Sequence, residues 1–371
     1  MSYITFQPSD YFNTKLWSGD DTSPRSLTGV GFQPDWTIIK KRSTAGSHVV
    51  FDAVRTAGST KGLATNSTAQ EGLTATEGTT AVYGYVSSFD SDGFTVTAGT
   101  GAGANSDAYV NNTSDNYVAW NWKANGAGSS NTDGSVTSTV SANTTAGFSI
   151  VKWTANLSSA VTVGHGLGTT PKVIIMKAID QTSGWVVGGF GLDWSGYLLL
   201  EGTNAFSNDS NDSTGSGRFF SPGGTEPTSS VFSTNSAALT GSATDVIAYC
   251  FAEKKGFSKF GTYTGNGSTD GPMVYTGFKP AFVITKQTNT TGFWTLKDNK
   301  RPSDQNPNDT NIYPNSTDAE ATSANDVDFL SNGFRIRNTG SYQNTSGGTY
   351  LYLAFASEPL VSSNDIPATA R

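Results

Sequence analysis

One ten-residue pattern occurs three times in the chain, and this repetition limits the fold more than any other feature of the sequence. GFQPDWTIIK at residues 31–40 returns as GFKPAFVITK at residues 277–286, and a looser copy, GLGTTPKVIIMK, occupies residues 166–177. In each copy a proline precedes a run of β-branched and aromatic residues that ends in lysine. A proline suits a strand position that needs no backbone donor, so we expect three buried strands, each with a solvated lysine end.

A second pattern follows each copy, with an alanine between bulky residues. It reads YVAWNW at residues 117–122, VIAYCF at 246–251 and YLAFA at 352–356. The distance from the proline to this alanine is 85, 77 and 74 residues. A small residue in such surroundings predicts a closely packed central strand in which one face has room only for a methyl group.

Two hairpins are expected between these patterns. FDSDGFTV at residues 89–96 and FLSNGFRI at 329–336 contain Asp-Gly and Asn-Gly pairs, which are typical of two-residue turns with positive φ angles. The middle copy has VFSTN at residues 231–235 without such a pair, so its hairpin is expected to be altered.

The composition favours the same fold class. Aromatic residues make up 12% of the chain and charged residues only 14%, with 42 glycines, a balance that favours strands separated by tight turns. We therefore predict an all-β protein of three tandem antiparallel β-sandwich-like domains related by internal repeat. Their predicted boundaries are residues 1–124, 147–255 and 256–371.

Three polar stretches lie outside the predicted strands. Residues 125–146, rich in Gly, Ser, Thr and Asn, read as a linker or an extended surface strand. Residues 208–217 and 301–315 are predicted to form exposed loop tips, because they cannot bury enough apolar surface to offset the entropy of ordering. Asn211 and Asp304, one in each stretch, are therefore candidate contacts for a glycan or a protein partner.

Charge and residue counts argue against several classes of function. The net charge of −7, without a local cluster of Lys and Arg, argues against nucleic-acid binding. The single cysteine, Cys250, and two separate histidines, His48 and His165, predict no internal disulfide, no zinc site and no cofactor. No run of 18 apolar residues and no basic, apolar leader is present in this sequence, so we expect synthesis in the cytoplasm and no membrane insertion.

Candidate catalytic groups are few, and each has a structural alternative. His165 lies in GHGLG, a turn whose counterparts in the other two copies lack histidine. Two carboxylates are what a glycosidase needs, but nothing in the sequence fixes a distance between the available ones, which are Asp35, Asp52, Glu71, Asp90 and Asp92. DSDG at residues 90–93 resembles a fragment of a calcium loop, but the full pattern needs a further ligand and a Glu at the twelfth position, so we interpret it as a hairpin turn. Asp209 and Asp212 are interpreted as part of a solvated loop. We therefore expect no enzyme activity.

Several tryptophans are candidates for stacking on sugar rings. These are Trp17, Trp153, Trp185, Trp194 and Trp294. Most of them must be core residues, because three small sandwiches need many large side chains. Trp185 and Trp294 follow matching glycine-containing turns and are the preferred candidates for contact with a glycan.

Short motifs along the whole chain resemble a family of repeat-containing virion proteins from marine short-tailed phages that infect cyanobacteria and heterotrophic bacteria. The motifs are MSYITFQP at residues 1–8, segments at 31–40, 117–126, 142–151, 165–168, 249–255 and 263–267, and IPATAR at 366–371. Members of that family are often labelled tail fibre or hypothetical protein. The chain departs from the family at residues 153–156, WTAN, where an aromatic-Thr-Gly-Asn-Gly turn is usual. That turn is retained as YTGNG at residues 263–267.

The resemblance implies a bacteriophage structural protein on the virion surface, present in several copies for each particle. These copies are either separate or assembled into a homo-oligomer. Our leading hypothesis is a tail-associated fibre or adhesin-like component that contacts other virion proteins and a host cell-surface glycan. The first alternative is a capsid decoration protein, in which three linked modules mimic a trimer on a local threefold axis of the head. The second alternative is a polysaccharide depolymerase.

Overall fold

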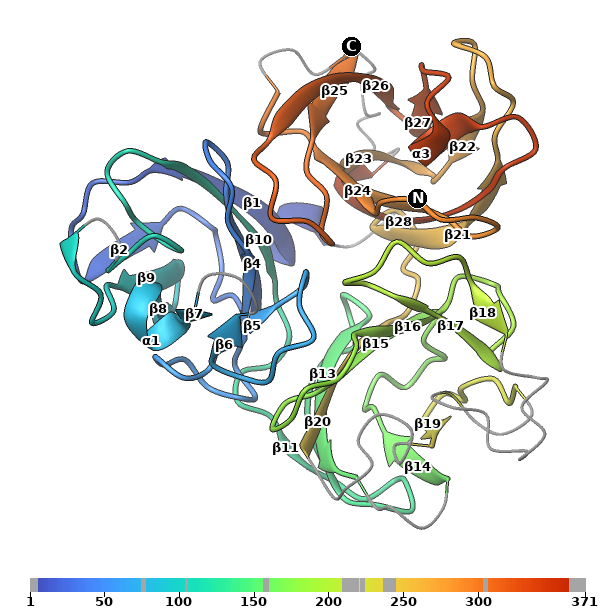
Figure 1. The fold of residues 1–371 in the computed structure, drawn as a ribbon. Helices are drawn as coiled ribbons and strands as arrows, with labels where there is room; N and C mark the ends of the chain where they lie inside the picture. Colours follow the sequence, from blue (N-terminus) through green and yellow to red (C-terminus); the bar gives the residue numbers. More distant parts are fainter. Residues whose placement is uncertain are drawn as a thin grey trace.

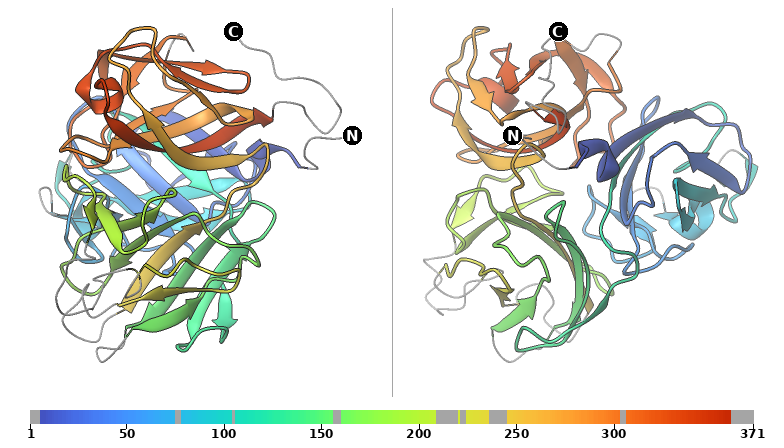
Figure 2. Two further views of the ribbon diagram at one scale, coloured as in Figure 1. Left: turned by 90° about the vertical axis from the view of Figure 1, so that its right-hand side faces the viewer. Right: turned by 180° about the vertical axis from the view of Figure 1, so that it is seen from behind.

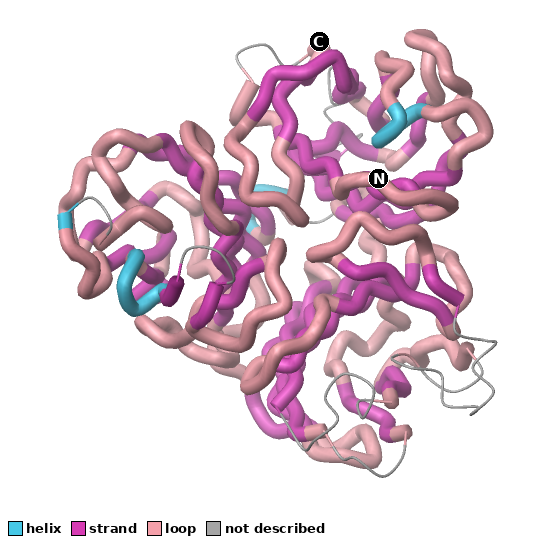
Figure 3. Tube along the Cα trace, in the orientation of Figure 1, coloured by secondary structure: helices cyan, strands magenta, loops and turns pink. Residues whose placement is uncertain are grey.

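The fold was analysed in a computed structural model, which describes residues 6–74, 78–103, 106–155, 160–208, 220, 224–235, 245–302 and 306–359. The predicted all-β class is confirmed: antiparallel sheets account for nearly all regular structure, and the described helices are single short turns, as Figure 3 shows. No helix among the described residues is long and apolar enough to cross a membrane.

The strands form three lobes around a common centre (Figure 1). We call them lobe 1, lobe 2 and lobe 3 in chain order. Lobe 1 contains β1 Phe12–Ser18, β2 Arg25–Thr28, β3 Trp36–Lys41, β4 His48–Asp52, β5 Leu63–Ala64, β6 Leu73–Thr74, β7 Gly78–Thr79, α1 Thr80–Tyr83, β8 Tyr85–Asp90, β9 Gly93–Thr97 and β10 Asn116–Trp122, and the 3-10 turn η1 Pro8–Asp10 precedes it.

Lobe 2 contains β11 Ser129–Asn131, β12 Ser138–Asn143, β13 Phe148–Thr154, β14 Val161–Gly164, β15 Val173–Ala178, β16 Val186–Gly189, β17 Gly196–Leu199, β18 Ser207–Asn208, β19 Val231–Thr234 and β20 Asp245–Phe251. Lobe 3 contains β21 Ser258–Thr264, β22 Met273–Tyr275, β23 Phe278–Gln287, β24 Thr295–Asp298, β25 Asn308–Asn311, β26 Ala321–Leu330, β27 Gly333–Ile336, α3 Ser341–Asn344 and β28 Thr349–Pro359.

Each lobe has an inner sheet that faces the centre and an outer sheet beyond it, an arrangement that the right-hand view in Figure 2 also shows. In lobe 3 both sheets have four strands. The inner sheets have the strand orders β1-β10-β3-β4-β5, β11-β12-β13-β20-β15-β16-β17-β18 and β21-β28-β23-β24. In all three, the strand that carries the alanine pattern (β10, β20 or β28) lies between two neighbours. The prediction of central strands at these positions is therefore confirmed.

The register shows that the third alanine pattern is shifted by two residues. Ala119 pairs with Ile39 on β3, and Ala248 pairs with Met176 on β15. The corresponding position on β23, Thr285, pairs with Tyr352, whereas Ala354 pairs with Val283. The prediction that one small residue stands at the same place in all three copies was therefore wrong for lobe 3.

The lysines that close the three proline-initiated strands are buried, which corrects the expectation of a solvated end. Lys40, Lys177 and Lys286 are each 0% exposed. Their ammonium groups donate to backbone carbonyls: Lys40 to Gly46 and Thr317, Lys177 to Ser183 (2.8 Å) and Thr68 (3.1 Å), and Lys286 to Gln287 (2.5 Å). These bonds satisfy the charge inside the protein, which periodicity along a strand does not reveal.

Both predicted hairpins are present, but the glycines serve a different purpose. Asp90 pairs with Gly93 and Leu330 pairs with Gly333 across two-residue turns. The two residues between each pair have no positive φ, although Gly93 itself has a φ of +148°. A Cβ on Gly93 would lie 2.0 Å from the Leu27 carbonyl oxygen, and one on Gly333 would lie 2.0 Å from that of Val274. Glycine is required because a neighbouring strand approaches closely. In lobe 2 the residues 231–234 form β19, which pairs with β14.

The polar stretch at residues 125–146 is ordered and contributes β11 and β12 to the sheet of lobe 2. It matches the second of the two interpretations, an extended surface strand. Residue ranges for three separate domains remain a prediction, because the largest hydrophobic cluster contains side chains from all three lobes.

Candidate functional site at the junction of the three lobes

Two matching networks of buried charges lie where the lobes meet. In lobe 3, Asp298 ends β24 and its carboxylate accepts a 2.5 Å bond from Nε of Arg301. In lobe 1, Asp52 ends β4 and accepts a 2.6 Å bond from Nε of Arg55. The side chains of all four residues are at most 1% exposed. Both aspartates lie 18 residues after the proline of their copy.

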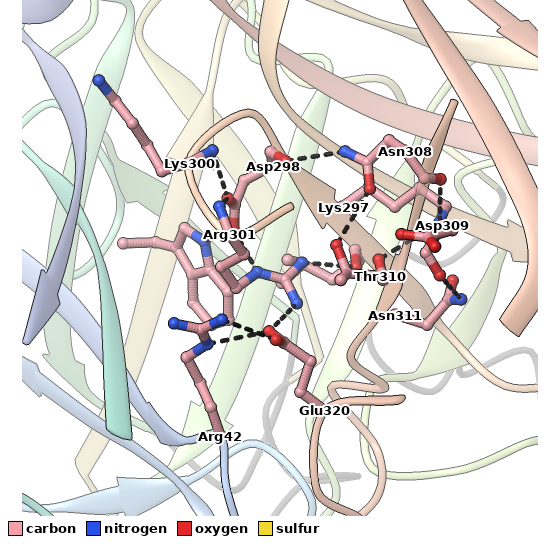
Figure 4. A network of polar contacts seen from close by, with 12 residues as sticks. Arg42, Lys297, Asp298, Lys300, Arg301, Asn308, Asp309, Thr310, Asn311 and Glu320 are labelled. Carbon is pink, nitrogen blue, oxygen red and sulfur yellow. Dashed lines mark hydrogen bonds and ion pairs between the residues drawn. The ribbon is translucent and has the colours of Figure 1, made fainter. Parts of the chain in front are cut away.

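The network in lobe 3 extends across the seam to lobe 1 (Figure 4). Arg301 donates a 2.9 Å bond from Nη1 to Glu320, and Arg42 of lobe 1 holds both carboxylate oxygens of Glu320, at 2.7 and 3.0 Å. From lobe 1, the indole Nε1 of Trp120 donates a 2.8 Å bond to Asp298. The guanidinium of Arg301 also lies 5.6 Å from the Trp120 ring centre, a cation–π distance.

The network in lobe 1 makes the equivalent connection to lobe 2. Arg55 donates from Nη1 to Glu71 at 3.0 Å, and the phenol of Tyr249 in lobe 2 donates to Asp52 at 2.7 Å. Tyr249 and Trp120 occupy matching positions, because they pair with Ile175 and Ile38 in the two corresponding strands.

Electrostatics in these networks favour the charged pair. Burial alone would raise the pKa of Asp298, but the Arg301 charge and its hydrogen bonds outweigh burial and lower that pKa. Burial would lower the pKa of Arg301, and the charges of Asp298 and Glu320 raise it instead. Burial and the Asp52 charge together raise the pKa of the Tyr249 phenol well above its ordinary value. The Asp298 carboxylate and the Arg301 guanidinium therefore remain ionised, and the Tyr249 phenol remains a donor.

Lobe 2 replaces the network with apolar groups. Gly189 occupies the position of the aspartates, since it pairs with Val173 as Asp52 pairs with Trp36 and Asp298 with Phe282. Three residues later, Leu192 stands where the arginines stand. Leu353 of lobe 3 pairs with Ile284 and so takes the position of Trp120 and Tyr249. Lobe 2 therefore lacks the acceptor carboxylate, and lobe 3 has Leu353 in place of the donor side chain that would face it.

Three equivalent loops join the lobes into a closed ring. Gly46 donates its N–H to the Thr317 carbonyl (2.7 Å), Ser183 to that of Thr68 (2.9 Å) and Gly292 to that of Thr203 (2.8 Å). A second set runs in the opposite direction: Glu320 to Arg42 (2.9 Å), Glu71 to Ile179 (2.7 Å) and Phe206 to Thr288 (2.8 Å). Lobe 1 therefore binds lobe 2, lobe 2 binds lobe 3, and lobe 3 binds lobe 1 through matching backbone bonds.

The two preferred tryptophans lie inside this ring. Trp185 is 1% exposed and donates to the Ala64 carbonyl of lobe 1 at 2.8 Å, and Trp294 is 2% exposed and donates to the Leu199 carbonyl of lobe 2 at 2.9 Å. With His48, both line a central apolar cavity of about 40 Å³. Neither ring has a face in solvent, so the structure gives these tryptophans a packing role. Trp17, Trp153 and Trp194 are buried as well. Asn211 and Asp304 lie outside the described residues, as do Asp209 and Asp212.

The other candidate catalytic groups have structural partners. His165 is buried; its Nδ1 accepts from the Leu167 N–H at 3.2 Å, Nε2 lies 3.3 Å from the Thr228 carbonyl, and burial lowers its pKa. Burial also lowers the pKa of His48 well below its ordinary value. Asp92 accepts from the Gly29 and Gly31 amides at 3.0 and 2.7 Å and thereby closes the hairpin. Within the described ranges, no group of three or more His, Cys, Asp or Glu residues is arranged to hold a metal ion.

Sequence reasoning missed the charge networks, although a signal was present. DAVR at residues 52–55 and DNKR at residues 298–301 share Asp-x-x-Arg at the same distance from the proline, and GFGL at residues 189–192 replaces it in the middle copy. A comparison of the three copies beyond their apolar runs would have found it.

One family model matches almost the whole chain. It is described as a domain of unknown function, DUF7483, and it covers residues 7–359. No curated protein and no solved structure matches the chain.

Proposed function

Because the chain belongs to the DUF7483 family of domains of unknown function, its role must be inferred from its own architecture, and we propose that it is a non-enzymatic structural protein on the surface of a bacteriophage particle. The observation that carries this proposal is the closed ring of three lobes. These buried charges join the lobes, since Asp52, Arg55, Asp298 and Arg301 are all paired at the junction.

The proposal also covers the domain type of the lobes and their relationship to one another. We interpret them as three copies of one β-sandwich-like domain related by internal repeat. The matching registers of β3, β15 and β23 with their central strands support this, as do the two sets of backbone bonds between lobes.

The location that the ring geometry supports best is the head, as a capsid decoration protein. Figure 1 shows a single chain with three lobes arranged around one centre. Such a chain fits a local threefold axis, where three identical copies of another protein meet. One chain on each axis would then replace a trimer of smaller proteins.

The experiment is to image particles produced with and without this gene and to locate the chain in a reconstruction of the intact particle. Density for one chain on local threefold axes, together with fragile heads when the gene is removed, is the expected result. Intact heads that lack any density for the chain would contradict the head location.

The second candidate is a tail-associated fibre or adhesin-like component, which remains supported by the resemblance to proteins labelled tail fibre. It predicts that particles without the gene keep stable heads but fail to adsorb to the host. Normal adsorption by such particles would remove this candidate.

The proposed lack of enzyme activity has its own test. Purified protein is incubated with host surface polysaccharide and new reducing ends are measured. We expect none, since the candidate glycosidase carboxylates Asp52 and Glu71 share the same arginine partner, Arg55. Release of reducing ends would establish the depolymerase alternative instead.

A further inference from the structure

A polar groove of about 250 Å³ lies on the seam between lobes 1 and 3. Ser9, Asn13 and Thr14 line it from lobe 1, and Lys279, Asn299 and Lys300 line it from lobe 3. The groove is distinct from the charge network that holds the same seam together. Figure 4 shows the Lys300 side chain pointing away from Asp298 and Arg301, to which only its backbone is near.

The charge in this groove is opposite to that of the protein. The chain carries a net charge of −7, yet no described residue that lines the groove has a carboxylate. Among the described residues, neither Lys279 nor Lys300 forms an ion pair. Two unpaired ammonium groups beside one groove make it suited to an anion.

In lobe 1, the position equivalent to Ala281 holds a buried carboxylate. Asp35, which follows Pro34, is 2% exposed, and its carboxylate accepts bonds from the Ala124 N–H (2.7 Å) and from Gln33 (3.1 Å). Ala281, which follows Pro280, is its counterpart in lobe 3. The Ala53 N–H bonds to the Asp35 carbonyl at 2.8 Å, and the Asn299 N–H bonds to the Ala281 carbonyl at 2.9 Å.

Two equivalent positions therefore differ between lobe 1 and lobe 3. The internal carboxylate of lobe 1 is replaced by the methyl group of Ala281, which lines the groove. Gln33, which donates to that carboxylate, is replaced by Lys279. Lobe 3 has lost the anion and gained a cation at the neighbouring position, so the groove is complementary to a carboxylate that comes from outside the chain.

Two further polar atoms of the groove lack partners. The Thr14 hydroxyl and the Asn299 side-chain oxygen belong to residues that line the groove, but both atoms are inaccessible to solvent and have no hydrogen-bond partner among the described residues. Buried polar atoms are normally paired, so a rotation of either side chain that exposes its unpaired atom to the groove would gain a bond to a ligand. A hydroxyl and an amide are suited to the hydroxyl groups of a sugar.

We propose that this groove binds a small carboxylate-bearing ligand of the size of one acidic sugar unit. Lys279 and Lys300 pair with the carboxylate, and the Thr14 and Asn299 side chains rotate toward the groove to bond to hydroxyl groups. The volume supports a small ligand, since pockets for drug-sized molecules begin at about 300 Å³. The proposal does not depend on the location of the protein in the particle.

The test is calorimetric titration of the full chain with glucuronate, and with glucose and acetate as comparison ligands. We expect glucuronate to bind at least about tenfold more tightly than either, since glucose lacks the charge and acetate lacks the hydroxyl groups. Equal binding of glucose would overturn the role of the lysines. Equal binding of acetate would overturn the sugar unit, and no binding of glucuronate would overturn the whole proposal.

Two variants locate the binding. Lys279→Ala combined with Lys300→Ala should weaken glucuronate binding by at least about tenfold, because both charged partners are removed. Ala281→Asp restores the carboxylate of lobe 1 and should abolish binding by occupying the groove. Lys172→Ala is the matched control, because Lys172 is the exposed counterpart of Ala281 in lobe 2. This variant should bind glucuronate as tightly as the parent chain does. Thermal unfolding confirms that each variant is folded. Unchanged affinity in the folded lysine variant would overturn the proposal even if Ala281→Asp failed to fold.

Discussion

The phenol of Tyr249 donates a 2.7 Å hydrogen bond to the carboxylate of Asp52, and the two residues lie 197 positions apart in the chain. Tyr249 belongs to lobe 2 and Asp52 to lobe 1, so this bond closes one seam of the ring. Its counterpart at the next seam is the 2.8 Å bond from Trp120 to Asp298. At the third seam both partners are apolar or absent, with Leu353 facing a lobe that has Gly189 in place of the aspartate. Donor and acceptor are therefore matched across each seam.

Removal of the Tyr249 hydroxyl tests this matching. In Tyr249→Phe the buried Asp52 carboxylate loses one donor, and a hydrogen bond to a charged group contributes about 1.5–3 kcal/mol. We expect the free energy of unfolding in urea to fall by that amount. Tyr275→Phe is the control, because Tyr275 is 57% exposed, and its change should stay within about 0.5 kcal/mol. An equal loss in both variants would show that the seam bond contributes nothing specific.

Arg301→Met tests the buried charges themselves. The change leaves Asp298 and Glu320 without their shared partner in the interior, and breaking a buried pair from one side costs about 3–5 kcal/mol. Arg337→Met is the matched control, since Arg337 forms an exposed pair with Asp328 at 3.5 Å, of a kind that contributes about 0–1 kcal/mol. Chemical denaturation of both variants measures the difference. Similar losses would mean that burial of the network has no special role.

Lys297 predicts a dependence of stability on pH. It is 1% exposed, and burial, helped by the nearby Arg301 charge, lowers the pKa of its ammonium group to about 7 from the ordinary 10.5. Between these two values the unfolded chain binds more protons than the folded protein, so this group makes the protein more stable as pH rises. The slope is at most about 1.4 kcal/mol for each pH unit.

The measurement compares the parent chain with Lys297→Met by urea unfolding at pH 7 and pH 9. The difference in unfolding free energy should shift in favour of the parent chain at the higher pH, whatever the absolute effect of losing the bonds to the Asn308 and Thr310 carbonyls. A constant difference, or a shift in the opposite direction, would show that Lys297 does not titrate in this range.

Gly333→Ala tests the reason for the hairpin glycine. The added Cβ would lie 2.0 Å from the Val274 carbonyl oxygen, a distance that forces β22 and β27 apart. We expect a loss of at least about 2 kcal/mol, as for other overpacked sites. Gly292→Ala is the control, because its Cβ would meet its nearest neighbour at 3.6 Å. Thermal unfolding of the two variants measures the effect, and equal melting temperatures would refute the steric explanation.

Local sequence was sufficient for the elements of the fold. Prolines followed by β-branched and aromatic residues marked β3, β15 and β23, and Asp-Gly and Asn-Gly marked the two hairpins, because strand and turn preferences are properties of neighbouring residues. Local sequence did not predict features that depend on how one strand pairs with another. The third alanine lies two residues away from its counterpart, although Phe282 pairs with Phe355 just as Trp36 pairs with Trp122. Only this pairing shows that Tyr352, and not Ala354, takes the place of Ala119.

The candidate site depended even more on distant contacts. Trp185 and Trp294 could be identified as special from their matching turns, but a turn does not say whether the following ring faces solvent or another lobe. Lys40 and Lys177 likewise donate to carbonyl groups of another lobe, those of Thr317 and Thr68, whereas Lys286 donates to the adjacent Gln287.

The sequence by itself determined an all-β protein with a threefold internal repetition, because the repeat and the strand patterns are written in adjacent residues. Only the tertiary structure decided that the lobes close into a ring, that the lysines and tryptophans are inside it, and that one seam carries a cationic groove. These properties depend on which groups from remote parts of the chain meet in a medium without water, where an unpaired charge or polar atom is costly and a matched one is stable.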